Sequence, residues 1–252
     1  MKKVNNHNFF SFIRFFIKVL PLILVLPGIS RGAIAPDRTR IIFNEGEKSA
    51  SITLSNRNTK VPYLAQGWLE DENGNKSENF FAVLPPVQKI GPGQESQIRL
   101  QALPTVASLP KERESVFWFN LREIPPKPEK GNTLQIALQT RIKLFYRPIS
   151  IQQKEGGVPW QEKMILSIHG QKVTIKNPTP FFITIADIDS HKGGDGIKGF
   201  EPVMINPFDE TVLNVKASST GLHPVVTYVN DHGGRPEIEF ICNTSNCQLN
   251  KK

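Results

Sequence analysis

The sequence is poor in cysteine and has no long uninterrupted apolar run. Its 252 residues include two cysteines, and the longest uncharged apolar run covers only residues 19–27. A helix that crosses a membrane needs about 20 apolar residues, so this run is too short to be one. No long stretch carries apolar residues at helical spacing either. These absences argue against a membrane-spanning protein and against a helical fold.

The first 32 residues contain no acidic residue, and the order of their segments is typical of a secretory signal peptide. A basic start is followed by the apolar run and then by small residues. We predict a signal peptide over residues 1–32, with cleavage after Gly32. Cleavage after Ala35 is disfavoured because it would place Pro36 next to the scissile bond. The alternative is an uncleaved membrane anchor.

The basic character of the chain belongs mostly to this leader. The formal net charge is +8 for the whole sequence and falls to +3 when residues 1–32 are removed. No dense run of lysine and arginine remains, so we expect no nucleic-acid partner. The 220 residues after the leader are enough for two domains of about 110 residues each.

The two cysteines, Cys242 and Cys247, lie close together near the end of the chain. In an exported protein such a pair favours a disulfide. A zinc site is the alternative, but no His or Cys accompanies them at metal spacing. The histidines are His7 in the leader and four scattered others, and no Gly-x-Ser-x-Gly elbow appears. We therefore expect no metal, no cofactor and no catalytic residues.

Short alternating runs separated by turns predict an all-β fold. Residues 49–54 alternate with the period of two that is typical of a half-buried strand, and Asn73-Gly74 is a strong turn signal. One set of strand-like runs ends with residues 134–146, and a second set begins after Pro148. We predict two β-sandwich domains, residues 33–148 and residues 149–252.

Several specific runs in both domains carry a family resemblance. The strongest are Phe-Asn-Leu-Arg-Glu-Ile-Pro-Pro at 119–126 and Lys-Leu-Phe-Tyr-Arg-Pro at 143–148, joined by Asn-Pro-Thr-Pro-Phe at 177–181 and Asn-Asp-His-Gly-Gly-Arg-Pro at 230–236. Together they resemble the PapD-like periplasmic pilus chaperones of the chaperone–usher pathway. The resemblance covers the whole chain after the leader. It implies two immunoglobulin-like β-sandwich domains at an angle, with a cleft between them.

The resemblance also implies a function and partners. A chaperone of this family lends a strand to a pilus or fimbrial subunit whose own sandwich lacks one, and then delivers the subunit to an outer-membrane usher. The expected location is the periplasm, and an unoccupied chaperone could associate with itself. The loop at 125–132 is short and lacks cysteine, which resembles the short-loop subclass whose clients build rigid pili.

Leu134, Ile136 and Leu138 occupy the position of the lent strand, and their spacing places them on one face of it. On pattern alone, the alternative is that they face the domain's own core. Arg40 and Lys143 match the two basic residues that bind the client's terminal carboxylate; ordinary solvated cations are the alternative. Lys143 has the opposite parity to the three aliphatic residues. A bulge or strong twist between residues 138 and 143 would bring it to their face, but the sequence does not show one.

Glu114, Arg147 and Asp231 match a charged trio that links the two domains in this family.

Two other classes of function stay open at this point. One is a two-domain immunoglobulin-like adhesin or structural pilus component, although residues 33–40 are short and charged for the donor extension of a pilin. The other is an exported hydrolase on a β-sandwich, for which the sequence offers no recognisable triad.

Overall fold

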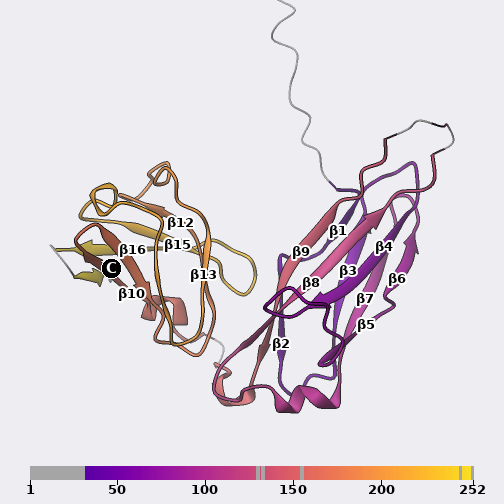
Figure 1. The fold of residues 1–252 in the computed structure, drawn as a ribbon, viewed down its shortest axis with the longest axis horizontal. Coiled ribbons are helices and arrows are strands. Elements are labelled where there is room, and N and C mark those ends of the chain that lie inside the picture. Colours follow the sequence, from indigo (N-terminus) through magenta and orange to yellow (C-terminus); the bar gives the residue numbers. More distant parts are fainter. Residues whose placement is uncertain (1–31, 129–130, 132–133, 154–155, 244–245, 251–252) are drawn as a thin grey trace, which may run out of the picture. The chain divides into compact units, whose positions relative to one another are not determined.

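The computed structural model describes residues 32–128, 131, 134–153, 156–243 and 246–250. The predicted signal peptide up to residue 31, and residues 129, 130 and 132 of the predicted short loop, lie outside these ranges. Figure 1 shows strands throughout the coloured part of the chain. Within the described ranges, no helix has the length and apolar character needed to cross a membrane.

The first domain is a sandwich of two sheets. Its strands are β1 (Ile34–Pro36), β2 (Arg40–Asn44), β3 (Ser49–Asn56), β4 (Tyr63–Glu70), β5 (Phe81–Leu84), β6 (Val87–Ile90), β7 (Glu95–Ala102), β8 (Ser115–Ile124) and β9 (Gln139–Arg147). One sheet has the order β1-β3-β7-β5 and the other has the order β2-β9-β8-β4-β6. Pairing is antiparallel except between β2 and β9, which run parallel.

The core of this domain lies between the two sheets, because alternate residues of each strand point inward. In β3, Ile52 and Leu54 are fully buried while their neighbours are not. Leu144 of β9 and Phe119 of β8 close the core from the second sheet. The period-two pattern in the sequence is therefore the pattern of burial in the structure.

The second domain repeats the same architecture with a separate core. Its strands are β10 (Ile165–His169), β11 (Lys172–Lys176), β12 (Ile183–Asp189), β13 (Val203–Ile205), β14 (Glu210–Val212), β15 (Val225–Tyr228), β16 (Glu237–Cys242) and β17 (Cys247–Leu249). The sheet orders are β10-β11-β14 and β13-β12-β15-β16-β17. Cys242 and Cys247 are cross-strand neighbours in β16 and β17 and form the predicted disulfide. The zinc alternative is therefore wrong.

One strand boundary differs from the prediction. The sequence pattern predicts a strand over residues 134–146, but β9 begins at Gln139. The last main-chain bond between the two segments runs from the Glu123 amide to the Leu138 carbonyl, at 3.0 Å. Beyond it the neighbouring chain continues as Ile124-Pro125-Pro126, and proline has no N–H to donate. Among the described residues, 134–137 are therefore left without main-chain bonds on this side.

Candidate functional site

Strand β9 presents different side chains on its two faces. Ile142, Leu144 and Tyr146 are buried in the core of the first domain. Lys143 lies between them in sequence and therefore points to the opposite face of the sheet. One face of β9 thus packs in the core of the first domain, and the opposite face carries Lys143.

The β8–β9 ladder contains no bulge that would bring Lys143 to the face of Leu138. The β8–β9 ladder runs from Arg122↔Gln139 to Ser115↔Tyr146 without a register shift. The bond from the Glu123 amide to the Leu138 carbonyl continues the same register by one residue. Regular alternation therefore leaves Leu138 and Lys143 on opposite faces of the sheet. The opposite orientations of Leu138 and Lys143 follow from regular alternation, without any distortion of the strand.

Arg40 and Lys143 are direct partners in the parallel β2–β9 ladder, so their side chains lie on the same face. Arg40 donates one bond from Nη1 to the Val229 carbonyl at 3.2 Å, while its buried Nε–H has no acceptor among the described residues. Lys143 Nζ donates to Thr184 Oγ1 at 3.1 Å. Both side chains thus reach residues of the second domain.

Arg40 and Lys143 place two positive charges side by side in partly buried positions. Burial lowers the pKa of Lys143 to about 8, and the neighbouring charge of Arg40 contributes to this lowering. Burial also lowers the pKa of Arg40, against the opposing attraction of Asp231 and Glu114. Within the described part of the chain, neither cation forms a salt bridge. Two adjacent cations of this kind bind a carboxylate favourably, because it neutralises their mutual repulsion.

Aromatic rings help to hold the two cations in place. Lys143 Nζ lies 5.8 Å from the centre of the Trp118 ring, and Arg40 Cζ lies 6.0 Å from that of Phe145. Phe145 in turn packs against Phe182 of the second domain, with ring centres 5.5 Å apart. Sequence reasoning missed the roles of these rings. Trp118 and Phe145 could have been found from the alternation of β8 and β9, which places both rings on the face of Lys143.

Glu114, Arg147 and Asp231 meet in one cluster. Arg147 donates from Nε to Glu114 Oε1 at 2.9 Å and forms two bonds to the Asp231 carboxylate, at 2.7 and 3.1 Å. The second oxygen of Glu114 accepts the Phe182 amide at 2.9 Å. Burial raises the pKa of Glu114 to about 7, although the Arg147 charge opposes this. Residues from both domains are therefore joined by charge-assisted hydrogen bonds.

The three aliphatic residues of the predicted lent strand are exposed to solvent. Leu134 is 86% exposed, Ile136 is 66% exposed and Leu138 is 40% exposed. They do not face the domain's own core, which was the alternative. Large aliphatic side chains at such exposure, two residues apart, form an apolar row that a partner can cover.

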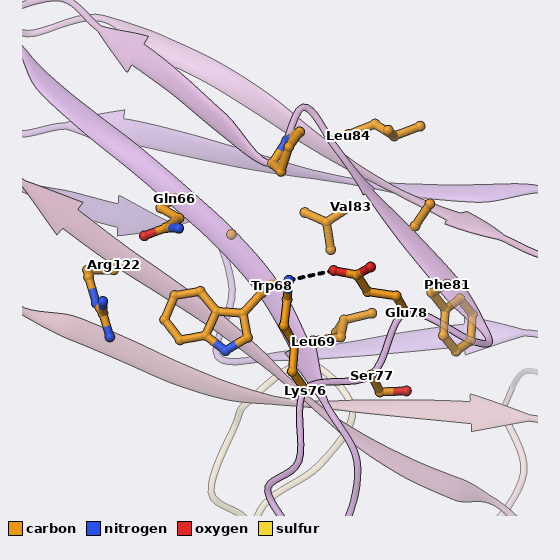
Figure 2. A pocket seen from close by; sticks show the side chains of 13 residues that line it. Gln66, Trp68, Leu69, Lys76, Ser77, Glu78, Phe81, Val83, Leu84 and Arg122 are labelled. Atoms are coloured by element: carbon orange, nitrogen blue, oxygen red, sulfur yellow. Dashed lines mark ion pairs between the residues drawn. The ribbon is translucent and has the colours of Figure 1, made fainter.

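A separate hollow of about 610 Å³ lies beside β4 and β5 (Figure 2). Its charged groups interact with neighbouring side chains: Lys76 pairs with Glu78, and Arg122 lies over the Trp68 ring at 5.1 Å. It therefore differs from the Arg40–Lys143 pair, whose cations form no ion pair with any residue that the structure describes. Among the described residues, no three His, Cys, Asp or Glu side chains gather as a metal site would require.

Both domains match known families of pilus assembly proteins. Residues 33–152 match the N-terminal domain, and residues 159–240 the C-terminal domain, of the PapD pili assembly chaperones, a family whose N-terminal model also includes flagellar-assembly chaperones. The chain therefore belongs to the PapD-like pilus chaperone family. This confirms the family and the fold of two immunoglobulin-like domains that the sequence motifs predicted.

Individual relatives extend over nearly the whole chain. The probable fimbrial chaperone YfcS of Escherichia coli K12 is 48% identical over 92% of this chain and 93% of its own length. The chaperone protein PapD of Escherichia coli is 44% identical over 87% of this chain and 91% of its own length. A chain in the solved complex of the Salmonella enterica SafA pilin with the SafB chaperone is 25% identical, with a TM-score of 0.70. That alignment covers 85% of this chain and 99% of the other.

Proposed function

We propose that this chain is a non-catalytic periplasmic chaperone that binds a pilus or fimbrial subunit by lending it a strand, and then delivers it to an outer-membrane usher. The observation that carries the proposal is the continuity of the site. The paired cations Arg40 and Lys143 adjoin the strand that leads back into the exposed row of Leu134, Ile136 and Leu138. An anchor for a chain end and a surface for a strand are therefore neighbours.

The free edge of β9 has room for a foreign strand. Strand β2 begins at Arg40, opposite Lys143, so its ladder covers only residues 143–147 of β9. On this side, residues 139–142 have no ladder partner among the described strands, and on the other side the main-chain pairing with β8 ends at Leu138. An added strand would satisfy these main-chain groups, as in other cases of β-augmentation.

The position of the cations sets the direction of the added strand. A terminal carboxylate bound between Arg40 and Lys143 places the client's last residue at the start of β2. The client chain then runs from residue 134 toward residue 143 of β9, in the same direction as β9 itself. A foreign strand in this orientation extends the line of β2, which also pairs in parallel with β9.

The aliphatic row would supply most of the apolar contact. Each side chain that becomes fully buried contributes about 1.5–3 kcal/mol before ordering costs. A subunit that lacks a strand exposes its own core, so the row would enter a complementary groove. In the absence of a client, the same edge is able to pair with a second copy of this chain. The predicted leader, cleaved after Gly32, would deliver the protein to the periplasm.

Co-expression with a candidate pilin tests the anchor. Arg40→Ala and Lys143→Ala should leave the chaperone folded but lower the recovered amount of pilin about tenfold or more, because a charge-assisted bond to the carboxylate is lost. Arg99→Ala is the matched control, since Arg99 is an exposed cation on β7 in the other sheet. The anchor is refuted if pilin recovery in both variants equals that of the control.

A further inference from the structure

Glu123 is a buried carboxylate without a cationic partner among the described residues. It lies near the end of β8, where its side chain follows Phe119 and Leu121 on the core face, and it is 6% exposed. Its Oε2 atom accepts the backbone amide of Ile34 at 2.8 Å. One hydrogen bond from a neutral amide offsets little of the free-energy cost of removing a carboxylate from water. A positive charge nearby would stabilise a buried carboxylate of this kind.

The start of β1 is fixed directly beside this carboxylate. Ile34 pairs with Asn56 of β3, and the Ala33 carbonyl accepts the Arg57 amide at 2.7 Å. Ala33 is therefore held by the sheet as firmly as the strand that follows it. Its nitrogen lies one residue before that of Ile34, about 3.5 Å further along an extended chain.

We propose that the positive charge for Glu123 is the α-ammonium group of Ala33, created when the leader is removed. In the uncut chain the same nitrogen belongs to a neutral peptide bond and can offer only an amide hydrogen. After cleavage following Gly32 it carries a charge and three donors, within reach of the carboxylate that already binds the next residue. The inference rests on the export and the cleavage site of the proposed function.

The pair would act on the client-binding segment through the backbone of Glu123. The Glu123 amide donates to the Leu138 carbonyl at 3.0 Å, and this is the last main-chain bond before the exposed row begins. Glu123 thus joins the start of β1 to the point where residues 134–138 leave the sheet. Removal of the leader would therefore stabilise the junction at which the client-binding edge begins in the exported, processed chain.

A double-mutant cycle on the exported protein tests the pair. One change inserts Gly-Ser between Gly32 and Ala33, which moves the new terminus two residues away from Glu123; the other is Glu123→Gln. N-terminal sequencing should find Ala33 as the first residue of the unmodified chain. The insertion should lower the Tm by about 3–6 °C when Glu123 is present and by less than about 1 °C in the Glu123→Gln background. Hydrogen exchange at the Glu123 amide should quicken with the insertion.

Glu95→Gln is the matched control, because Glu95 binds Ser55 beside β1 but is exposed. The insertion should cost the same Tm in this background as in the unmodified chain. A first residue other than Ala33, or an equal loss of Tm with and without Glu123, would overturn the proposal. If Glu123→Gln does not fold, an unchanged Tm and exchange rate after insertion alone overturn it. The assay contains no pilin, so its failure leaves client capture to be judged separately.

Discussion

The pairing of Arg40 with Lys143 is unfavourable for the free protein. Two like charges are direct neighbours across a ladder, and both are partly removed from water. Neighbouring like charges and burial each disfavour the charged forms. A protein that needed only stability would gain by replacing one of them with an apolar residue. The arrangement is explained if a bound carboxylate supplies the missing negative charge.

The binding of a client carboxylate should depend on pH. Since burial lowers the pKa of Lys143 to about 8, the side chain is charged below that pH and loses its charge above it. The affinity for a peptide with a free C-terminal carboxylate should therefore fall roughly tenfold as the pH rises from about 6.5 to about 9.5, with Arg40 providing what remains. Fluorescence titration of a peptide from the client's last strand measures this.

Two controls isolate the contribution of Lys143. An amidated peptide should bind weakly at every pH, and Lys143→Arg should remove most of the pH dependence because arginine stays charged. The folding stability of the free chain should change with pH in the opposite direction to this affinity. The lowered pKa means that the folded state binds fewer protons than the unfolded state, so stability rises with pH from about 8 toward 10.5, the ordinary pKa of lysine. Affinity that does not change with pH would contradict the assignment of Lys143.

The residue roles at this site come from long-range contacts, which limits what the sequence can predict. Arg40 and Val229 are 189 residues apart in the chain, and Lys143 and Thr184 are 41 apart. Composition and spacing contain no signal for such pairs, and the family motifs alone brought Arg40 and Lys143 together. The motifs did not indicate Val229 or Thr184, because hydroxyl and carbonyl groups occur throughout the second domain.

At the scale of the strand, the exposed row begins where the main-chain pairing with β8 ends, at Leu138. The two prolines after Ile124 remove the donors that would have extended the ladder. Unpaired strand edges normally favour aggregation, and proteins tend to cover or interrupt them. Here the edge is left open beside an apolar row, and it is suited to a temporary partner.

Ile136→Asp should separate binding from folding. The side chain is 66% exposed, so the free energy of unfolding should change by less than about 0.5 kcal/mol. Client capture should fall at least tenfold, because the complex loses about 1.5–3 kcal/mol of apolar burial and gains a buried charge. Urea unfolding and the yield of co-purified pilin give the two values.

Leu222→Asp serves as the comparison, since Leu222 in the second domain is 67% exposed and lies outside the row. It should alter neither stability nor capture by a comparable amount. Equal capture by Ile136→Asp and the unmodified chain would show that the row does not enter the client.

The sequence predicted the long strands better than the short ones. Alternation over residues 49–54 located β3, which has one buried face, and the mostly apolar run at residues 116–121 located β8, which is buried on both faces. β13 and β17 have three residues each, which is too few for a periodic signal. The boundary of β9 was wrong because alternation continues through residues 134–138, whereas hydrogen bonding ends there. Side-chain alternation can be seen in the sequence of a single segment. Main-chain pairing cannot, because it also depends on the neighbouring segment.

At the scale of the whole molecule, the Glu114–Arg147–Asp231 cluster connects the two domains through buried charge. Glu114 is 3% exposed, and its carboxylate accepts bonds from Arg147 and the Phe182 amide. The Glu114 amide also donates to the Pro180 carbonyl at 2.9 Å. Since Arg40 and Lys143 reach into the second domain as well, the anchor depends on the same junction.

Arg147→Ala should lower the free energy of unfolding by about 3–5 kcal/mol, because it leaves the Glu114 carboxylate buried and unpaired. Asp231→Ala should cost only about 1 kcal/mol, since Asp231 is more exposed and its loss leaves Arg147 paired with Glu114. Urea denaturation of the free chain provides both values. Removal of the exposed Lys76–Glu78 pair by Lys76→Ala gives the surface reference. Similar losses in the Arg147 and Asp231 variants would contradict the central position of Glu114.

The regular register between Leu138 and Lys143 has a consequence for how this protein can vary over generations. Four residues, 139–142, separate the apolar row from the cation that receives the chain end. An insertion or deletion of one residue here would turn the inward-facing side chains outward. It would also shift every contact with the client by one residue. Substitutions along this stretch are compatible with the site, but insertions and deletions are not.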